Sequence, residues 1–439
     1  MKGKKAFSIL PILAAVSIPA FFTSCAFMEL QKDLDRIAAN GTIHGQVTGP
    51  RAKKAPVIMI AYAAGGKIVR YKHLNSSADY YAFSLPGKQS YQLAAFEDTN
   101  NNLKYDRGEP AALWANRGRT VLPATGQILH PLKLSSDTNI PSAYKTDISK
   151  FDKKTGDKFV IITGQTANID DKRFSAAVGH QGLWTPMTFL EKYGLGVYFL
   201  EKYDPDKIPV LFIYGIDGNA QSWKYFLEHI DRNHFQPWFY FYPSGFRIGK
   251  SGKALDIIIR ELQTKYRFRK MFVLAHSMGG LVARELVKRQ LANNKNFIKL
   301  LITISTPWKG DKDAEWSKHA PAVIPCWYDL MPDSDLVKSI KPDDLGTIPY
   351  YLLFSYKGDR KPFRLNNDSV VYISSELKFD MQKRAEKVYG FNLKHDEMLK
   401  SSDLVELCND IFHKYTPDNE KKNSNSMEDF FGIFSTGRN

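Results

Sequence analysis

Strand-like apolar runs interleave with amphipathic helical segments over residues 158–415. Pro209 to Gly215 is an unbroken apolar run, as expected for a strand covered on both faces. Further runs of this kind are Pro237 to Tyr242, Met271 to Ala275, Leu300 to Ile304 and Tyr350 to Phe354. Repeated βα units predict an α/β domain with a doubly wound, mostly parallel sheet.

Residues 41–134 show another pattern, in which short strand-like runs are separated by Gly, Pro, Asn and Ser. Strands at this spacing without helices predict a small all-β sandwich. The pattern resembles that of the carboxypeptidase-regulatory or transthyretin-like sandwiches, which implies a spacer or binding module. Residues 135–157 are polar and predict an interdomain linker, and the Lys-, Asn- and Ser-rich residues 416–439 predict a disordered tail.

The N-terminus has the layout of a secretory signal peptide over residues 1–24, with three lysines before an uncharged run. Phe22 to Ala26 resembles the lipobox of bacterial lipoproteins. The resemblance implies that Cys25 is acylated, that residues 25–40 form a lipidated tether, and that the protein is exported and membrane-anchored, in the outer membrane or facing the periplasm. A plain secreted protein and an uncleaved N-terminal anchor are the alternatives.

With 439 residues, of which 43% are hydrophobic, the chain is long enough for two globular cores. The net charge of +15 falls to +12 without the three signal-peptide lysines, which suits anionic lipid headgroups or envelope polymers. Nucleic acid is not an expected partner of an exported chain without a groove-reading motif. Cys326 and Cys408 could pair in an oxidising compartment, but two buried free thiols are favoured, because Cys408 lies on the apolar face of a predicted helix.

A calcium loop is one interpretation of residues 98–109. Oxygen side chains occupy positions 1, 3, 5, 9 and 12 of an EF-hand-like spacing, namely Asp98, Asn100, Asn102, Asp106 and Glu109. Position 6 is Leu103, where such a loop normally has Gly, so a solvated Asn-rich turn is the alternative.

The run Met271 to Ala283 predicts a strand, a sharp turn and a helix, with Ser277 at the apex of the turn. Small residues two before and two after Ser277 permit the tight bend that projects a nucleophilic hydroxyl from a sheet edge. Tetrahedral oxyanions need donors aimed at them in advance. The expected donors are the backbone N–H groups of Met278, at the helix start, and Ile216, in the loop after the first core strand.

A serine hydroxyl needs a base oriented by a carboxylate. Downstream of Ser277, the histidines that could serve are His319, His395 and His413, and His395 is favoured because it lies in the loop before the last helix. Asp359 and Asp368 both follow the Tyr350 strand. Asp368 is favoured, since Asp359 lies in a cationic run typical of an exposed loop.

Several segments in order resemble the bacterial triacylglycerol-lipase and esterase branch of the α/β-hydrolases. They are Gly215 to Gly218, Ala275 to Gly280, Thr303 to Gly310 and Asn367 to Val371, together with His395. The resemblance implies Ser277 as nucleophile, Asp368 as acid and His395 as base. Ala275 for Gly, Tyr214 for His and Ser369 for Gly are departures from the pattern of such lipases.

These features favour a serine hydrolase that cleaves carboxylic esters, with lipid or phospholipid acyl esters as the expected substrates and no cofactor in the chemistry. The apolar insertion at 308–345 is either a lid that binds acyl chains or a cap on the core. The alternative function is a non-catalytic, membrane-tethered binding module on a hydrolase fold.

Overall fold

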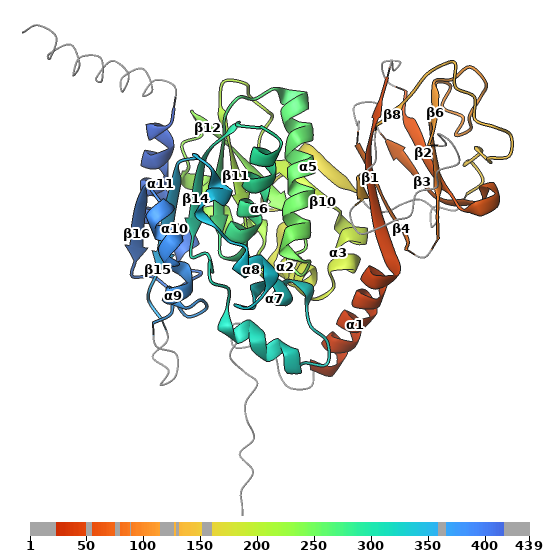
Figure 1. Ribbon diagram of the computed structural model, residues 1–439. Coiled ribbons are helices and arrows are strands. Elements are labelled where there is room, and N and C mark those ends of the chain that lie inside the picture. The colour runs from red at the N-terminus through yellow and green to blue at the C-terminus, as the bar shows by residue number, and fades with distance from the viewer. Residues whose placement is uncertain are drawn as a thin grey trace, which may run out of the picture. The chain divides into compact units, whose positions relative to one another are not determined.

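The computed structural model describes residues 23–49, 55–74, 80–87, 89–114, 127–128, 131–151, 160–358 and 366–416. The described chain divides into two compact units (Figure 1). The smaller unit is Ala26–Ile161 with Thr185–Leu195, and the larger is Ile162–Trp184 with the chain from Gly196 onward. Almost all of the predicted signal peptide, nearly the whole predicted tail and Asp359 lie outside the described residues.

Two four-stranded sheets form the smaller unit, which confirms the small strand-rich region predicted before the α/β domain. One sheet contains β1 (Asn40–Thr48), β4 (Tyr80–Pro86), β7 (Gln127–Ile128) and β8 (Leu132–Lys133). The other has the order β3-β2-β5-β6, with β3 (Ile68–Leu74), β2 (Val57–Tyr62), β5 (Gln92–Glu97) and β6 (Ala111–Leu113). Alternate side chains of β2 and β5 contribute to two separate apolar clusters, as expected for a sheet covered on both faces.

Segments flanking the strands also pack within the smaller unit. Ile140 and Ile148, from the segment predicted as a linker, are buried in the second apolar cluster. The predicted tether forms helix α1 (Thr23–Ala39), whose Asp33 accepts hydrogen bonds from the backbone N–H groups of Met187 (2.6 Å) and Thr188 (3.1 Å). These two residues follow Pro186 in the first turn of helix α3 (Pro186–Tyr193), so Asp33 supplies acceptors for N–H groups that a helix leaves unpaired.

The larger unit is built on an eight-stranded sheet with the order β16-β15-β14-β13-β11-β12-β10-β9. Its strands are β9 (Ile161–Thr166), β10 (Leu195–Phe199), β11 (Ile208–Ile213), β12 (Phe235–Phe241), β13 (Met271–His276), β14 (Ile298–Ile304), β15 (Tyr350–Ser355) and β16 (Lys387–Phe391). The strand pairs from β12 through β11 and β13 to β16 are parallel, whereas β10 is antiparallel to β12. The predicted mostly parallel sheet is therefore confirmed.

Helices cover both faces of this sheet. Phe212 and Phe239 are register partners on one face, and Phe212 contacts Phe226 of α4 (Lys224–His229) at 5.5 Å between ring centroids. Tyr240 points to the opposite face, where its hydroxyl donates to the Ser251 carbonyl of α5 (Ile248–Tyr266) at 3.0 Å. Helix α5 packs along α6 (Met278–Ala292), as Figure 1 shows.

The remaining elements of the larger unit are short, apart from the last helix. They are η3 (Lys172–Phe174), α2 (Ala176–Trp184), η4 (Ala220–Trp223), η5 (Lys312–His319), α7 (Pro325–Leu330), α8 (Asp335–Lys338), η6 (Pro342–Leu345), α9 (Ile373–Glu376), α10 (Phe379–Arg384), η7 (Met398–Lys400) and α11 (Ser402–Lys414); the smaller unit adds η2 (Ala64–Gly66). No helix among the described residues is both long and apolar enough to span a bilayer.

The insertion at 308–345 packs much of its apolar surface inward. Trp308, Ile324 and Trp327 are buried, whereas Trp316 is 56% and Tyr328 46% exposed. Cys326 in α7 and Cys408 in α11 are both buried free thiols, so no disulfide joins them.

Candidate active site

Ser277 occupies the turn between β13 and α6, with φ 56° and ψ −134°. This is a strained conformation for a residue with a side chain, and such strain clusters at functional sites. Ser277 is held there by a hydrogen bond from its N–H to the carbonyl of Ile304 at 2.8 Å. A Cβ on Gly279 would lie 2.5 Å from the Ile213 carbonyl oxygen, so only glycine fits directly beyond the turn.

The loop after β11 approaches Ser277 closely. A Cβ on Gly215 would lie 2.7 Å from Ser277 Cβ and 3.1 Å from its Oγ, so the backbone of this loop passes directly beside the hydroxyl. The N–H of Ile216 has no hydrogen-bond acceptor within the described chain. Met278 is the first residue of α6, where helix N–H groups have no acceptor one turn earlier. The loop that carries Ile216 therefore passes beside Ser277 and Met278 directly follows it, and their role as oxyanion donors stays a prediction.

Asp217 fixes the conformation of the same loop. Its φ is 56°, and its N–H donates to Ser244 Oγ at 3.1 Å. Its carboxylate lies 3.1 Å from His180 Nδ1, and this hydrogen bond is the main reason why the pKa of His180 is raised. His180 lies in α2, far from this loop in sequence, and no motif in the chain pointed to it.

His395 and Asp368 meet in a buried pair. His395 Nδ1 lies 2.5 Å from Asp368 Oδ2, and the His395 backbone N–H donates to the Asp368 carbonyl at 2.9 Å. Asp368 Oδ1 accepts from the N–H groups of Val370 (3.0 Å) and Val371 (2.7 Å). Both side chains lie in loops, His395 after β16 and Asp368 before α9, and the hydrogen bonds fix their mutual orientation.

Burial and charge act in opposite directions on this pair. Burial alone would raise the pKa of Asp368, but the charge of His395 and hydrogen bonds from His395 and Ser355 lower it to about 2. Burial alone would lower the pKa of His395, but the Asp368 charge and hydrogen bond raise it above its ordinary 6.5. An ionised Asp368 therefore faces an imidazole that gains stability on protonation.

His276 brings the base loop to the nucleophile strand, and nothing in the sequence singled it out. It is the residue before Ser277, and its Nε2 donates to the His395 carbonyl oxygen at 3.2 Å. The two imidazole rings lie 4.5 Å apart between centroids. Burial and then the charge of His395 lower the pKa of His276 to about 3, so it is a neutral anchor. The described chain has no direct hydrogen bond from Ser277 Oγ to His395, a contact that often tightens only with substrate bound.

The other downstream histidines are engaged elsewhere. His413 Nε2 lies 3.0 Å from Asp231 Oδ2, which also lies 2.7 Å from His234 Nδ1. These three residues offer potential metal-ligand atoms within 4.8 Å of one another, but hydrogen bonds to one shared carboxylate already account for the arrangement. His319 packs near Trp316 in η5.

The five predicted calcium ligands lie in one turn of the smaller unit, namely Asp98, Asn100, Asn102, Asp106 and Glu109. Leu103 has φ 63°, the left-handed conformation for which an EF-hand loop uses Gly. The Asp98 carboxylate accepts from the backbone N–H groups of Asn102 (2.9 Å) and Leu103 (3.0 Å), and Asp106 Oδ2 accepts from the side-chain amide of Asn102 (2.6 Å). These bonds pair the loop within itself, and calcium binding stays a prediction.

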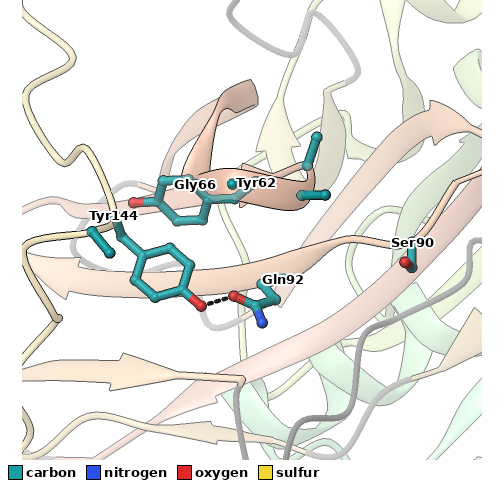
Figure 2. A pocket seen from close by; sticks show the side chains of 9 residues that line it. Tyr62, Gly66, Ser90, Gln92 and Tyr144 are labelled. Carbon is teal, nitrogen blue, oxygen red and sulfur yellow. Dashed lines mark hydrogen bonds between the residues drawn. The ribbon is translucent and has the colours of Figure 1, made fainter.

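A pocket of about 210 Å³ lies in the smaller unit (Figure 2). Tyr62 and Tyr144 form one part of its lining, with ring centroids 5.0 Å apart, and the Tyr144 hydroxyl donates to Gln92 Oε1. Gly66 and Ser90 contribute to the rest. Its lining residues include no Asp, Glu, His or Lys, and burial raises the pKa of Tyr62, which keeps that hydroxyl protonated.

The raised pKa of His395 predicts the pH dependence of the site. A base must be neutral to accept the Ser277 proton, so kcat/KM should fall as the pH drops through a pKa above 6.5. This acid limb is measured by following hydrolysis of a soluble ester between about pH 5 and 9. The ester should have a leaving group whose detection signal does not change with pH. A rate that stays flat across the range would exclude His395 as the base.

Comparison with known proteins gives one family match and fold-level similarities. Residues 245–315, which include the Ser277 turn, match the PGAP1-like alpha/beta domain. The mature lipase BlEst2 of Bacillus licheniformis is 18% identical, with 47% of this chain and 92% of that chain covered and a TM-score of 0.36. A putative aryl esterase of Burkholderia cenocepacia is 14% identical, with 50% and 95% covered and a TM-score of 0.34.

The carboxylesterase structure from the thaumarchaeon Nitrososphaera gargenis is 12% identical, with 51% of this chain and 97% of that chain covered and a TM-score of 0.36. No curated protein matches the chain. Three observations indicate the same fold, namely the order of the sheet, the strand-turn-helix around Ser277 and the family match. The larger unit has an α/β-hydrolase fold, preceded in the chain by a small strand-rich unit.

Proposed function

We propose that this protein is a serine hydrolase that cleaves carboxylic esters through an acyl-enzyme. The observation that carries the proposal is the buried His395–Asp368 pair, whose base loop is anchored by His276 next to the strained Ser277. A fold by itself does not imply an activity, so the proposal depends on these side chains and not on the similarities.

In the proposed mechanism, Ser277 Oγ attacks the ester carbonyl while His395 takes its proton through Nε2. Asp368 accepts from His395 Nδ1, which leaves Nε2 as the proton acceptor and stabilises the imidazolium that forms. The N–H groups of Ile216 and Met278 stabilise the oxyanion of the tetrahedral intermediate. His395 then protonates the leaving alkoxide, and water repeats the sequence to release the acid and restore Ser277.

Lipid or phospholipid acyl esters are the substrates we propose. The exposed Trp316 and Tyr328 of the insertion at 308–345 support this choice, since exposed aromatic side chains suit contact with acyl chains. A panel of p-nitrophenyl esters of increasing chain length, run beside phospholipid vesicles, tests it. We expect hydrolysis to favour medium or long chains, and activity confined to acetate would contradict the lipid assignment.

We also propose that Cys25 carries a lipid anchor that places the enzyme at a membrane facing the cell envelope. Cys25→Ser should move the protein from the membrane fraction to the soluble fraction, while hydrolysis of small soluble esters is retained. Fractionation followed by an ester assay measures both effects. Ser277→Ala is the matched control, since it should remain membrane-bound without activity. If Cys25→Ser stays in the membrane fraction, the anchor lies in the preceding apolar segment instead.

A non-catalytic binding module on the same fold is the competing function. It predicts a folded chain that no active-site-directed reagent labels. No described feature favours it, because a module without catalysis has no need to bury an ionised carboxylate against an imidazole.

A further inference from the structure

A second buried carboxyl group lies next to Asp368. Glu376, the last residue of α9, is 1% exposed, and no Lys, Arg or His forms an ion pair with it in the described part of the chain. Its Oε2 accepts a hydrogen bond from the Ser355 N–H at 3.3 Å, while the buried Oε1 has no hydrogen-bond partner in the described part of the chain. A buried carboxylate without a cation is costly, so this position favours the neutral acid.

Two serine hydroxyls connect Glu376 to the proposed catalytic pair. Ser355 Oγ donates to Asp368 Oδ2 at 2.7 Å, and Ser305 Oγ lies 2.7 Å from Ser355 Oγ. The Glu376 carboxyl lies close enough to the side chains of Ser305 and Asp368 for both to affect its pKa. Ser305 follows β14 and Ser355 ends β15, so the two hydroxyls lie at the ends of neighbouring strands.

The number of available protons decides which group donates in each hydrogen bond between these side chains. Each hydroxyl has one proton to donate, and an ionised carboxylate has none. Ser355 gives its proton to Asp368, so Ser305 must donate to Ser355. Ser305 then has no proton left, so a hydrogen bond between its hydroxyl and the Glu376 carboxyl requires the acid as the donor. A carboxyl group donates only when it is protonated.

We propose that Glu376 is a protonated carboxylic acid that positions Asp368 for His395 through the hydroxyls of Ser305 and Ser355. The inference rests on the proposed hydrolase function. Glu376 contacts neither Ser277 nor His395 in the described chain, so it is a positioning residue. Burial, and after it the charge of Asp368, raise the pKa of Glu376 to about 10, which agrees with the proton count.

Two substitutions test whether Glu376 acts as a hydrogen-bond donor or only fills space. Glu376→Gln keeps a donor for Ser305 and an acceptor for the Ser355 N–H, so kcat should stay within about threefold of wild type. Glu376→Leu removes both, and kcat should fall by about tenfold or more while KM changes little. Glu406→Gln, an exposed residue of α11, is the matched control and should leave kcat and its pH profile unchanged.

The pH profile adds a readout that a purely structural role would not change. Above about pH 10, ionised Glu376 places a second negative charge beside Asp368 and can no longer donate to Ser305. Wild type and Glu406→Gln should therefore lose kcat on an alkaline limb, and Glu376→Gln should lack that limb. The groups that act on the Glu376 carboxyl are Asp368, Ser355 and Ser305, of which Asp368 is the charged one.

Stability and infrared spectra test the proton without relying on activity. Folding raises the pKa of Glu376 from 4.5 to about 10, so its contribution is complete below pH 4.5 and is lost as the pH rises towards 10. Within that window, the unfolding equilibrium constant of wild type should rise about tenfold per pH unit relative to Glu376→Gln. The carbonyl stretch of a protonated carboxylic acid at neutral pH should also disappear in Glu376→Gln.

The outcomes separate this inference from the proposed function. Equal pH dependence of stability in wild type and Glu376→Gln, with no difference in the protonated-acid band, would overturn the protonated state of Glu376. Full activity in a folded Glu376→Leu would overturn its positioning role. Should Glu376→Leu fail to fold, the Glu376→Gln measurements still decide whether the acid is protonated. A wild type that hydrolyses no ester but shows the band would refute the proposed function alone.

Discussion

Ser277→Ala is expected to lower kcat for a p-nitrophenyl ester by about 10⁴-fold or more, because no other group can form the acyl-enzyme in the proposed mechanism. Labelling by a fluorophosphonate probe should disappear as well. Since the Ser277 side chain makes no hydrogen bond within the described chain, its removal should leave the thermal melt close to that of wild type. Initial-rate kinetics, probe labelling and a melt together measure the effect.

Ser402→Ala provides the matched control. Ser402 is an exposed residue in the first turn of α11, and its substitution should leave labelling and turnover unchanged. Folded wild-type protein that the probe does not label would contradict the enzyme and favour the binding module. Labelling that persists in Ser277→Ala would place the nucleophile elsewhere.

Asp368→Asn is expected to reduce turnover by roughly a thousandfold or more while the fold is retained. An Asn oxygen can still accept from the N–H groups of Val370 and Val371. The amide nitrogen would then face His395 Nδ1 and donate to it, which places the imidazole proton on Nε2, where Ser277 needs an acceptor. The positive imidazolium would also lose its counter-charge.

Asp359→Asn is the comparison for this prediction. Asp359 lies outside the described residues, in a cationic stretch of the sequence, and its substitution should change turnover by less than about tenfold. Thermal melts must accompany the kinetics of both variants. If Asp359→Asn were the inactive variant with its fold intact, the assignment of Asp368 would fail while those of Ser277 and His395 would stand.

Features that depend on residues adjacent in the chain were predicted better than features that depend on contacts between distant residues. The Ser277 turn could be predicted because the strand, the small residues and the helix that shape it are adjacent in the chain. Strand β3 was not predicted, because its buried residues are Ile68, Tyr71 and Leu74, which do not follow the two-residue period of a regular strand. A register shift in its pairing with β2 places Ile68 and Tyr71 in the same apolar cluster, whereas Leu74 packs in the other cluster.

The residues that hold the His395–Asp368 pair in place could not be predicted. His276 and His395 are 119 residues apart, and no periodicity links them. Glu376 lies in a four-residue helix near charged residues, a context typical of an exposed turn, yet it is buried. The pairing of His395 with Asp368 followed from their order along the chain, whereas the side chains that hold the pair depend on which strand ends the sheet brings together.

The hydrogen bonds between α1 and α3 limit how far the protein could stand from a bilayer. Asp33, eight residues after Cys25, is buried and bonded to the first turn of α3. Leu30, five residues after Cys25, is already fully buried, so at about 1.5 Å per helical residue only roughly 8 Å of helix separates an acylated Cys25 from the packed part of α1. Such an anchor would act as a short, stiff spacer, so the smaller unit would lie directly at the lipid headgroups. Only a longer segment after Cys25 would let the folded protein extend further from the membrane.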